Sequence, residues 1–253
     1  MAHLSIAGAT VSQAGAHWRS AGRTQRGQAR LRNEDAFLDN PHGGCWAVAD
    51  GMGGYRHGDV ASHWVVSHLA SVSAHGNLHQ RINTVRESLQ GVNQRLRRAW
   101  TEPDSNDGAT MGSTVVALLL ENGRAACVWA GDSRCYLWRG QNLYQLSKDH
   151  SLLRRLMDER HISVAQAQAH PDARALTRAV GARSRLDLEV LELSTRPGDV
   201  FLLCSDGLYQ TLSHVEVGRA LSRRTPRQAV EQLFAGALRR PVRDDLTAVV
   251  VQP

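Results

Sequence analysis

Short apolar runs bounded by turn signals recur along this chain and predict β-strands. The predicted strands cover residues 34–38, 44–49, 112–120, 124–130, 134–138, 142–146, 187–193, 199–204 and 246–251. Turn signals such as Glu121-Asn122-Gly123 and Arg196-Pro197-Gly198-Asp199 separate several of these runs by only a few residues. Because hairpin-length connections join antiparallel neighbours, we expect mostly antiparallel pairing.

Other stretches have the spacing of amphipathic helices. Helices are predicted over residues 58–73 and 80–100, and two more near the C-terminus begin after the N-caps Ser213 and Thr225, the latter followed by Pro226. The region 150–180 is less regular: its first part, 151–160, predicts a helix, and 161–174 predicts a mobile excursion. Hairpins separated from pairs of helices indicate an α+β domain in which helices cover sheets.

Length and composition favour one globular domain over residues 1–253, since 42% of the chain is hydrophobic and 21% is charged. The longest apolar run, residues 114–120, is far shorter than the roughly 20 residues that cross a bilayer. The N-terminus has no basic segment followed by a long apolar one, so we expect no secretory signal, no membrane partner and a cytoplasmic location. The cysteines lie in or beside apolar runs and form no CxxC pair, which favours reduced core thiols over a zinc site or disulfides. They are Cys45, Cys127, Cys135 and Cys204.

The chain is basic, with a formal net charge of +6 and an isoelectric point near 9.7. Arginine supplies most of the excess, most densely at Arg19, Arg23, Arg26, Arg30 and Arg32. This segment can form a solvated basic face, a contact for phosphate on a protein, or a nucleic-acid surface. Aromatic residues do not alternate with these arginines as they would in a base-stacking platform, so we expect no nucleic-acid partner. Steeply salt-dependent binding to DNA or RNA would favour the third interpretation.

Four aspartates, each beside a strongly apolar run, are the most informative feature of the chain: Asp50, Asp132, Asp206 and Asp244. A strand that ends in Asp-Gly can hold its carboxylate at the rim of a sheet, where glycine lets the backbone turn sharply. Any one of these acids could be a simple turn residue, because Asp favours turns in general. Together they predict a site for a hard divalent cation such as Mg²⁺ or Mn²⁺, which prefers oxygen ligands.

The motifs occur in a specific order along the chain. They are Arg30-x-x-x-Glu34-Asp35, Asp50-Gly51-Met52-Gly53-Gly54, Gly112-Ser113-Thr114, Gly131-Asp132-Ser133-Arg134, Ser205-Asp206-Gly207 and Asp244-Asp245-Leu246-Thr247. In this order the chain resembles the metal-dependent protein phosphatase family (PPM, type 2C), in its bacterial stand-alone form, over about residues 21–251. The resemblance implies a four-layer α/β/β/α sandwich, with two central antiparallel β-sheets flanked by helices. It also implies a flap over about residues 150–175 beside the active site.

The resemblance further implies a centre of two Mn²⁺ or Mg²⁺ ions at one end of the sandwich, with a third, weaker ion in bacterial members. By its place in the motifs, Asp50 would bridge the two ions. Glu34 and the backbone carbonyl of Gly51 would bind one of them, and Asp206 and Asp244 would bind the other.

Two further acids have roles in the same family pattern. Asp132 resembles the acid that binds the third ion together with Asp206, and Asp35 is expected to orient metal waters from behind the ligands. Where the family often has Asp-Asn, this chain has Asp244-Asp245. The register makes Asp244 the ligand and leaves open whether Asp245 also binds.

Arg30 matches the family's phosphate-binding arginine, whose planar fork suits two phosphate oxygens. The implied reaction is hydrolysis of phosphoserine and phosphothreonine on proteins by direct attack of a hydroxide that bridges the two metals, so no nucleophilic Ser or Cys is expected. Many relatives have a histidine, thought to be the general acid, where this chain has Met52. The general acid is therefore unassigned, and His57 and His150 are the candidates nearest the motifs in sequence.

The sequence thus predicts an enzyme, a serine/threonine protein phosphatase whose partners are phosphorylated Ser/Thr proteins. Bacterial members usually oppose a Ser/Thr kinase, in stress signalling, cell-wall control or type VI secretion. The alternative is a catalytically inactive phosphoprotein-binding scaffold of the same fold, which should have lost some of the acids, whereas this chain keeps them all. No heptad pattern or appended interaction segment is evident, so we expect a monomer.

Overall fold

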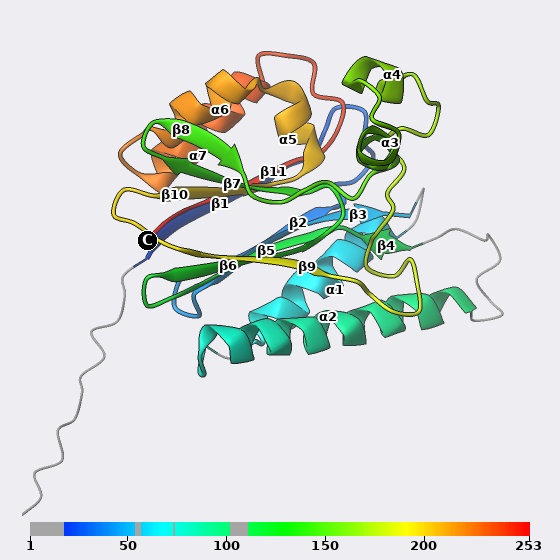
Figure 1. Cartoon of the computed structure of the whole chain (residues 1–253), viewed down its shortest axis with the longest axis horizontal. Coiled ribbons are helices and arrows are strands. Elements are labelled where there is room, and N and C mark those ends of the chain that lie inside the picture. The colour runs from blue at the N-terminus through cyan, green and yellow to red at the C-terminus, as the bar shows by residue number, and fades with distance from the viewer. Residues whose placement is uncertain (1–17, 54–56, 73, 102–110) are drawn as a thin grey trace, which may run out of the picture.

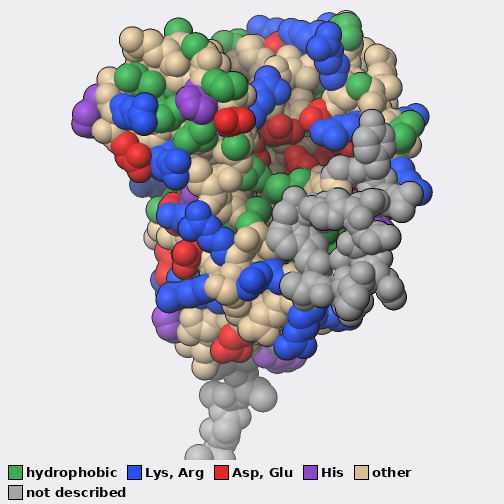
Figure 2. Space-filling view, turned by 90° about the vertical axis from the view of Figure 1, so that its right-hand side faces the viewer, with side chains coloured by type: hydrophobic (Ala, Val, Ile, Leu, Met, Phe, Trp, Pro, Cys, Tyr) green, Lys and Arg blue, Asp and Glu red, His purple; other side chains and the backbone are tan. Residues whose placement is uncertain are grey.

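The computed structural model describes residues 18–53, 57–72, 74–101 and 111–253. Within these ranges two antiparallel β-sheets pack face to face, and helices cover both outer faces (Figure 1). The predicted four-layer α/β/β/α sandwich is therefore confirmed. The end of the sandwich on the right of Figure 1 faces the reader in Figure 2, where it is hollowed.

One sheet has the strand order β1-β11-β10-β7-β8, and the other has the order β2-β3-β5-β6-β9, with β4 paired to β3. The strands are β1 (Arg19–Gln25), β2 (Asp35–Asn40), β3 (Cys45–Met52), β4 (Gly112–Ser113), β5 (Val115–Glu121), β6 (Arg124–Ala130), β7 (Arg134–Arg139), β8 (Asn142–Gln145), β9 (Glu189–Ser194), β10 (Val200–Cys204) and β11 (Leu246–Gln252). The helices are α1 (Gly58–Ala70), α2 (Leu78–Thr101), α3 (Leu152–Arg160), α4 (Val164–Gln168), α5 (Asp206–Thr211), α6 (His214–Leu221) and α7 (Pro226–Ala237).

The central strands are continuous apolar runs because both of their faces are buried. In β11, Val249 and Val251 point between the sheets, whereas Ala248 and Val250 belong to the cluster beneath α6 and α7. Successive side chains of a strand point to opposite faces, so an unbroken apolar run fills two core layers at once. All four cysteines are buried free thiols in these layers, as predicted.

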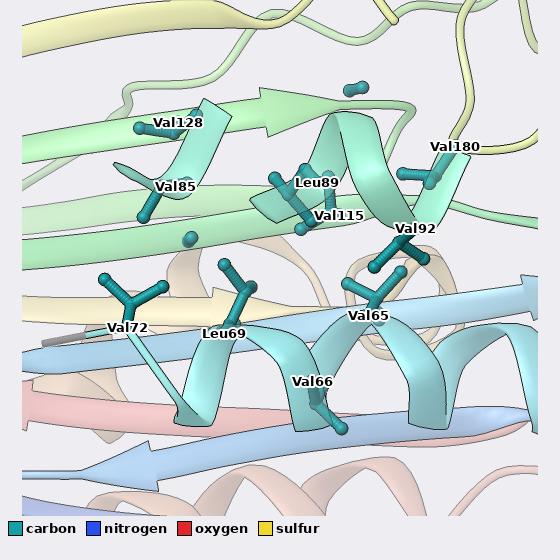
Figure 3. Packing of buried hydrophobic residues seen from close by; sticks show 14 of the residues in the cluster. Val65, Val66, Leu69, Val72, Val85, Leu89, Val92, Val115, Val128 and Val180 are labelled. Carbon is teal, nitrogen blue, oxygen red and sulfur yellow. The ribbon is translucent and has the colours of Figure 1, made fainter. Parts of the chain in front are cut away.

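On the other outer face, α1 and α2 pack on the second sheet through aliphatic side chains. Figure 3 shows Val65 and Leu69 of α1 facing Val85, Leu89 and Val92 of α2. These residues recur every three or four positions, so each helix turns one stripe of side chains toward the core. The predicted helices 58–73 and 80–100 therefore correspond to α1 and α2.

The helix start signals near the C-terminus are also confirmed. Ser213 and Thr225 each accept a hydrogen bond from a backbone N–H of the first turn, and Pro226 opens α7. These caps fix where α6 and α7 begin, beside the sheet that carries β10 and β11.

Three parts of the structure differ from the prediction. Strand β1 was missed because its sequence, RSAGRTQ, has no apolar alternation; Gly22 fits there since a Cβ would lie 2.4 Å from the Phe37 ring. The excursion predicted at 161–174 contains the short helix α4, which a capping box at Ser163 and Gln166 begins. Helix α5 was also missed, because a helix of six residues is too short to show a periodic pattern.

We predict that Leu89→Ala lowers the free energy of unfolding by about 2–5 kcal/mol, because it leaves a cavity between α2 and the sheet. Leu89 is fully buried, whereas Val215 on α6 is 68% exposed. The matched control Val215→Ala should change stability by less than about 0.5 kcal/mol. Urea unfolding followed by circular dichroism measures both, and equal effects would contradict this packing.

Candidate active site

A cavity of about 710 Å³ opens at one end of the sandwich and gathers the predicted acids. Five carboxylates line it: Glu34, Asp50, Asp132, Asp206 and Asp244. Arg30, Arg32 and Arg174 line it as well, and so does Gly51. Figure 2 shows the acidic side chains grouped in the hollow, with basic side chains around it. We call this cavity the acidic pocket.

Strand ends bring the four aspartates to the acidic pocket. Asp50 lies near the end of β3, and Asp132 lies in the turn between β6 and β7. Asp206 directly follows the segment that leaves β10 and starts α5, and Asp244 precedes β11 by two residues. Segments far apart in the sequence therefore meet because the two sheets end together at this edge.

The backbone around Asp50 is held by hydroxyl side chains. Its N–H donates to Thr114 Oγ1 at 2.9 Å, and its carbonyl accepts from the Thr114 N–H at 2.8 Å and from Ser113 Oγ at 3.1 Å. Thr114 Oγ1 also lies 2.7 Å from Ser133 Oγ. Sequence reasoning gave Ser113, Thr114 and Ser133 no role, although all three stand inside the motifs.

Glycine is required where β3 meets the start of α1. The Gly51 N–H donates to the Glu34 carbonyl at 3.0 Å, and a Cβ on Gly51 would lie 1.9 Å from the Gly58 carbonyl oxygen. A Cβ on Gly58 would in turn lie 2.6 Å from Glu34 Oε1. This close approach places the Gly51 backbone and the Glu34 side chain on the same wall of the pocket.

The turn that carries Asp132 is tied to the base of the flap. Gly131 has a φ of +114°, and its N–H donates to His150 Nδ1 at 3.1 Å while its carbonyl accepts from the His150 N–H at 2.9 Å. On the other side, Tyr209 donates its hydroxyl to the Asp132 carbonyl at 3.1 Å. A shift of the flap base at His150 would thus move the Asp132 turn.

The two histidines considered as general acids do not line the acidic pocket. His57 is the N-cap of α1, and His150 is buried, with Nε2 at 3.2 Å from Glu189 Oε1. In the described part of the chain, no histidine is among the residues that line the pocket. Burial lowers the pKa of His150 and so favours the neutral ring. The hydrogen bond to Glu189 has a smaller, opposite effect on this pKa.

Asp244 and Asp245 have different surroundings. Asp245 is buried, and its two oxygens accept hydrogen bonds from the backbone N–H groups of Gly27 and Glu34, both at 2.8 Å. Asp244 faces the pocket, where Arg30 binds it in a bidentate manner, with Nε to Oδ1 at 2.8 Å and Nη2 to Oδ2 at 2.9 Å. Asp245 therefore fastens the chain before β2 to the chain before β11, and Asp244 is the acid that a ligand in the pocket can reach.

Asp35 lies behind the acidic pocket and is not among the residues that line it. It pairs with Asp50 across β2 and β3, and its Oδ2 accepts from Ser205 Oγ at 2.7 Å and from Thr247 Oγ1 at 2.6 Å. Burial raises the pKa of Asp35 to about 7, although these two hydrogen bonds oppose the rise. Asp35 thus joins the strand start of β2 to the segments that carry Asp206 and Asp244.

The acids of the pocket repel one another, and burial adds to the cost of their charges. Burial, followed by repulsion from Asp35, Asp206 and other carboxylates, holds the pKa of Asp50 well above its usual value. Burial and then repulsion from Asp206 raise the pKa of Asp132 to about 7. Burial is also the main cause of the raised pKa of Glu34. The pocket therefore favours any ligand that brings positive charge.

This donor set fits a hard divalent cation, because it consists of carboxylate oxygens and the Gly51 backbone. No three His, Cys, Asp or Glu side chains in the described ranges come close enough together to bind one ion by themselves. Water and backbone oxygens would have to complete the coordination. That is ordinary for Mg²⁺, which keeps several waters when a protein binds it.

Comparison with known proteins agrees with this geometry. The model of the family described as protein phosphatase 2C matches residues 22–248. The serine/threonine phosphatase stp of Listeria monocytogenes is 33% identical over 91% of this chain and 94% of that protein. Serine/threonine protein phosphatase PstP of Mycobacterium tuberculosis is 33% identical over 92% of this chain and 44% of that protein.

Solved structures give the same result. PppA, described as a key regulatory component of T6SS in Pseudomonas aeruginosa, has a TM-score of 0.85 and 40% identity, covering 94% of this chain and 98% of that one. The PstP catalytic domain in complex with two manganese ions has a TM-score of 0.78 and 32% identity, covering 93% and 97%. Both chains share the two-sheet sandwich described above.

A helix-covered double sheet with an acidic pocket at one end thus defines the class of metal-dependent protein phosphatases. The chain belongs to the protein phosphatase 2C family. Within it, the relatives named above are bacterial serine/threonine phosphatases, which supports an active enzyme and not an inactive scaffold of the same fold.

We predict that the two neighbouring aspartates contribute to stability by different amounts. Asp245→Asn should lower the free energy of unfolding by about 1–3 kcal/mol, because an amide cannot accept both backbone N–H groups. Asp244→Asn should lower it by less than about 1 kcal/mol, since its ion pair with Arg30 is partly exposed. Urea unfolding in EDTA measures both, and a larger loss for Asp244→Asn would contradict the assignment.

We also predict that Mn²⁺ raises the melting temperature of EDTA-treated protein by roughly 5 °C or more at saturation, because it neutralises the acids of the pocket. Asp50→Asn should melt higher than the wild type in EDTA, since one repelling carboxylate is gone, and should lose most of the Mn²⁺ effect. Asp187, which is exposed outside the acidic pocket, offers a control: Asp187→Asn should keep the full shift. A full shift in Asp50→Asn would contradict a cation site at Asp50.

Proposed function

We propose that this chain, a metal-dependent serine/threonine protein phosphatase, hydrolyses phosphoserine and phosphothreonine on proteins at the acidic pocket. The observation that carries the proposal is the bidentate contact between Arg30 and Asp244 at the edge of the acid group. An arginine fork and a set of carboxylates side by side can hold a phosphate and its cations in adjacent positions.

We assign the cation ligands to Glu34, Asp50, Asp206 and Asp244 with the Gly51 carbonyl, and Asp132 to a further, weaker ion. Two divalent cations, Mn²⁺ or Mg²⁺, would activate water and offset negative charge at phosphorus. The PstP neighbour with two manganese ions supports this count. Asp35 acts from behind, where it fixes the β2 edge against β3 through Ser205 and Thr247.

Arg30 positions the substrate phosphate. Asp244 accepts from its Nε and Nη2, and its Nη1 lies 3.7 Å from Glu34 Oε2, so a phosphate that takes two of these donors would compete with the carboxylates. Asp244, released from Arg30 in this way, would be able to hold a cation, while Arg30 would hold the phosphate. Lysine at this position would supply charge without the planar two-point contact.

The proton for the leaving serine or threonine oxygen comes from water in the pocket. Met52 lines the pocket where many relatives have a histidine, and its thioether cannot donate a proton. The described lining has no histidine or lysine that could replace it. Nothing in the proposal requires a nucleophilic Ser or Cys, and the four thiols are buried in the core.

The cellular role follows from the same chemistry. A phosphatase of this kind would oppose a bacterial Ser/Thr kinase, and the likeness to PppA favours type VI secretion among the settings considered above. Among the helices described, none is long and apolar enough to cross a membrane. We assign residues 1–253 to one catalytic domain that works as a monomer in the cytoplasm, with residues 150–175 as its flap.

The test is hydrolysis of an uncharged phosphothreonine peptide and of p-nitrophenyl phosphate in EDTA, Mg²⁺ or Mn²⁺. Wild-type turnover should require the metal, and Asp206→Asn should lower kcat/KM by at least about 100-fold, because the acid group loses a charge that neutralises the cations. Arg30→Lys should weaken turnover of both substrates, because each carries the phosphate that loses the two-point contact.

Glu87→Gln, at an exposed position of α2 outside the acidic pocket, is the matched control for the same carboxylate-to-amide change, and it should retain full activity on both substrates. Metal-independent turnover, or full activity in Asp206→Asn, would contradict the proposed function.

A further inference from the structure

A second, smaller hollow lies next to the acidic pocket. It has a volume of about 200 Å³ and is lined by Arg155, Arg178, Arg183, Arg185 and Asp187, among others; we call it the basic groove. Residues 174–176 line the acidic pocket and residues 177–179 line the basic groove, so one short chain segment separates the two. Figure 2 shows basic side chains on the same face below the acidic hollow.

The basic groove carries unbalanced positive charge. Four arginines face one aspartate in its lining. Arg178 is paired with Glu189 at 2.8 Å, and Arg185 approaches Asp187 at 3.5 Å. With the residues that the structure describes, Arg155 and Arg183 make no ion pair, so their guanidinium groups are available to an incoming anion.

The arginines come from separate elements that converge on the groove. Arg155 is on α3 of the flap, whereas Arg183 and Arg185 belong to the segment that leads into β9. The segment around Arg178 is held in place, because Thr177 N–H donates to the His150 carbonyl at 2.8 Å and Val180 pairs with Ser113. The groove therefore has one wall fixed to the catalytic core and one wall on the flap.

We propose that the basic groove binds anionic side chains of the phosphoprotein segment next to the residue being dephosphorylated. This inference rests on the proposed function, since the acidic pocket must hold the phosphoresidue. Arginine forks bind carboxylates and phosphates alike, so the shared chemistry is an Asp, a Glu or a second phosphoresidue.

The spacing suits neighbouring residues of one extended peptide. An extended chain advances about 3.3 Å per residue, so side chains two to four residues from the phosphoresidue lie about 7–13 Å away. The acidic pocket and the basic groove share residues 174–179 as a wall, so a side chain within this reach of the phosphoresidue can extend past that wall into the groove. The basic groove would thus select substrates by their acidic context, while the acidic pocket performs the same reaction on all of them.

The experiment compares kcat/KM on three phosphothreonine peptides in saturating Mn²⁺. The first has glutamine at the second, third and fourth positions on either side, the second has glutamate there, and the third has one further phosphothreonine and otherwise glutamine. Wild type should favour the glutamate or doubly phosphorylated peptide by about 3- to 10-fold, the size expected for two partly exposed ion pairs. Raising the salt concentration should reduce this preference.

The double variant R183Q/R185Q should lose the preference and keep wild-type activity on the glutamine peptide and on p-nitrophenyl phosphate. The control R224Q/R239Q removes the same charge at exposed positions outside both hollows, and should keep the preference. Which anionic peptide gains more tells whether carboxylates or a second phosphate occupy the groove.

Equal kcat/KM of the wild type on all three peptides would overturn the inference, and so would an equal loss in both double variants, which would indicate a general effect of charge. A loss by R183Q/R185Q on the glutamine peptide as large as on the glutamate peptide would also overturn it. No turnover of the glutamine peptide or p-nitrophenyl phosphate by the wild type would instead contradict the proposed function.

Discussion

The structure depends on holding mutually repelling carboxylates together at one end of a double sheet. Without a rigid backbone, Asp50, Asp132 and Asp206 would move apart or bind protons. Burial and repulsion from neighbouring carboxylates raise the pKa of each. They stay in place because their backbone is fixed by neutral partners, such as Thr114 for Asp50 and Tyr209 for Asp132. The fold therefore tolerates an electrostatic repulsion among these carboxylates that a bound cation would offset.

The four-layer architecture makes this framework stiff. Trp46 and Val48 of β3 pack between the sheets, and Ala47 and Ala49 pack beneath α1, so the strand that ends at Asp50 is buried on both faces. Asp245 adds a lateral tie, because it joins the chain near Gly27 and Glu34 to the start of β11. A core of this kind has one close-packed arrangement and resists small displacements of its edges.

The sequence predicts most of the strands and helices and the acids that meet at the pocket. Strands buried on both faces and helices with one apolar stripe leave strong patterns, and the motif acids stand at their ends. The hydrophobic pattern does not predict elements that depend on tertiary contacts. Strand β1 forms because it pairs with β11, and Gly22 permits close packing against Phe37. Helix α5 likewise forms around a short Asp206-Gly207 segment that reads as a turn.

The roles of individual site residues also depend on tertiary contacts that the sequence does not show. Motif order indicated which acids meet, but the distinction between Asp244 and Asp245 required the hydrogen bonds, since adjacent carboxylates in an exposed-looking segment carry no pattern of their own. The role of His150 was also hidden, because a buried histidine that accepts from Gly131 has the same sequence signature as a catalytic one. An ionisable residue in a motif can be structural or catalytic, and its hydrogen-bond partners distinguish the two roles.

The charge of the chain and the charge of its pocket have opposite signs, and both suit a phosphoprotein substrate. The net charge of +6 and the arginines around the hollow attract an anionic protein over a long range. Inside the hollow the sign reverses, so the phosphate alone would be repelled by Asp50 and Asp206. Cations held by these carboxylates would remove this repulsion at short range, where Coulomb interactions are strongest. Long-range attraction and local repulsion together would make turnover depend on a cation, because the surface would attract phosphoproteins whose phosphate the acidic pocket alone repels.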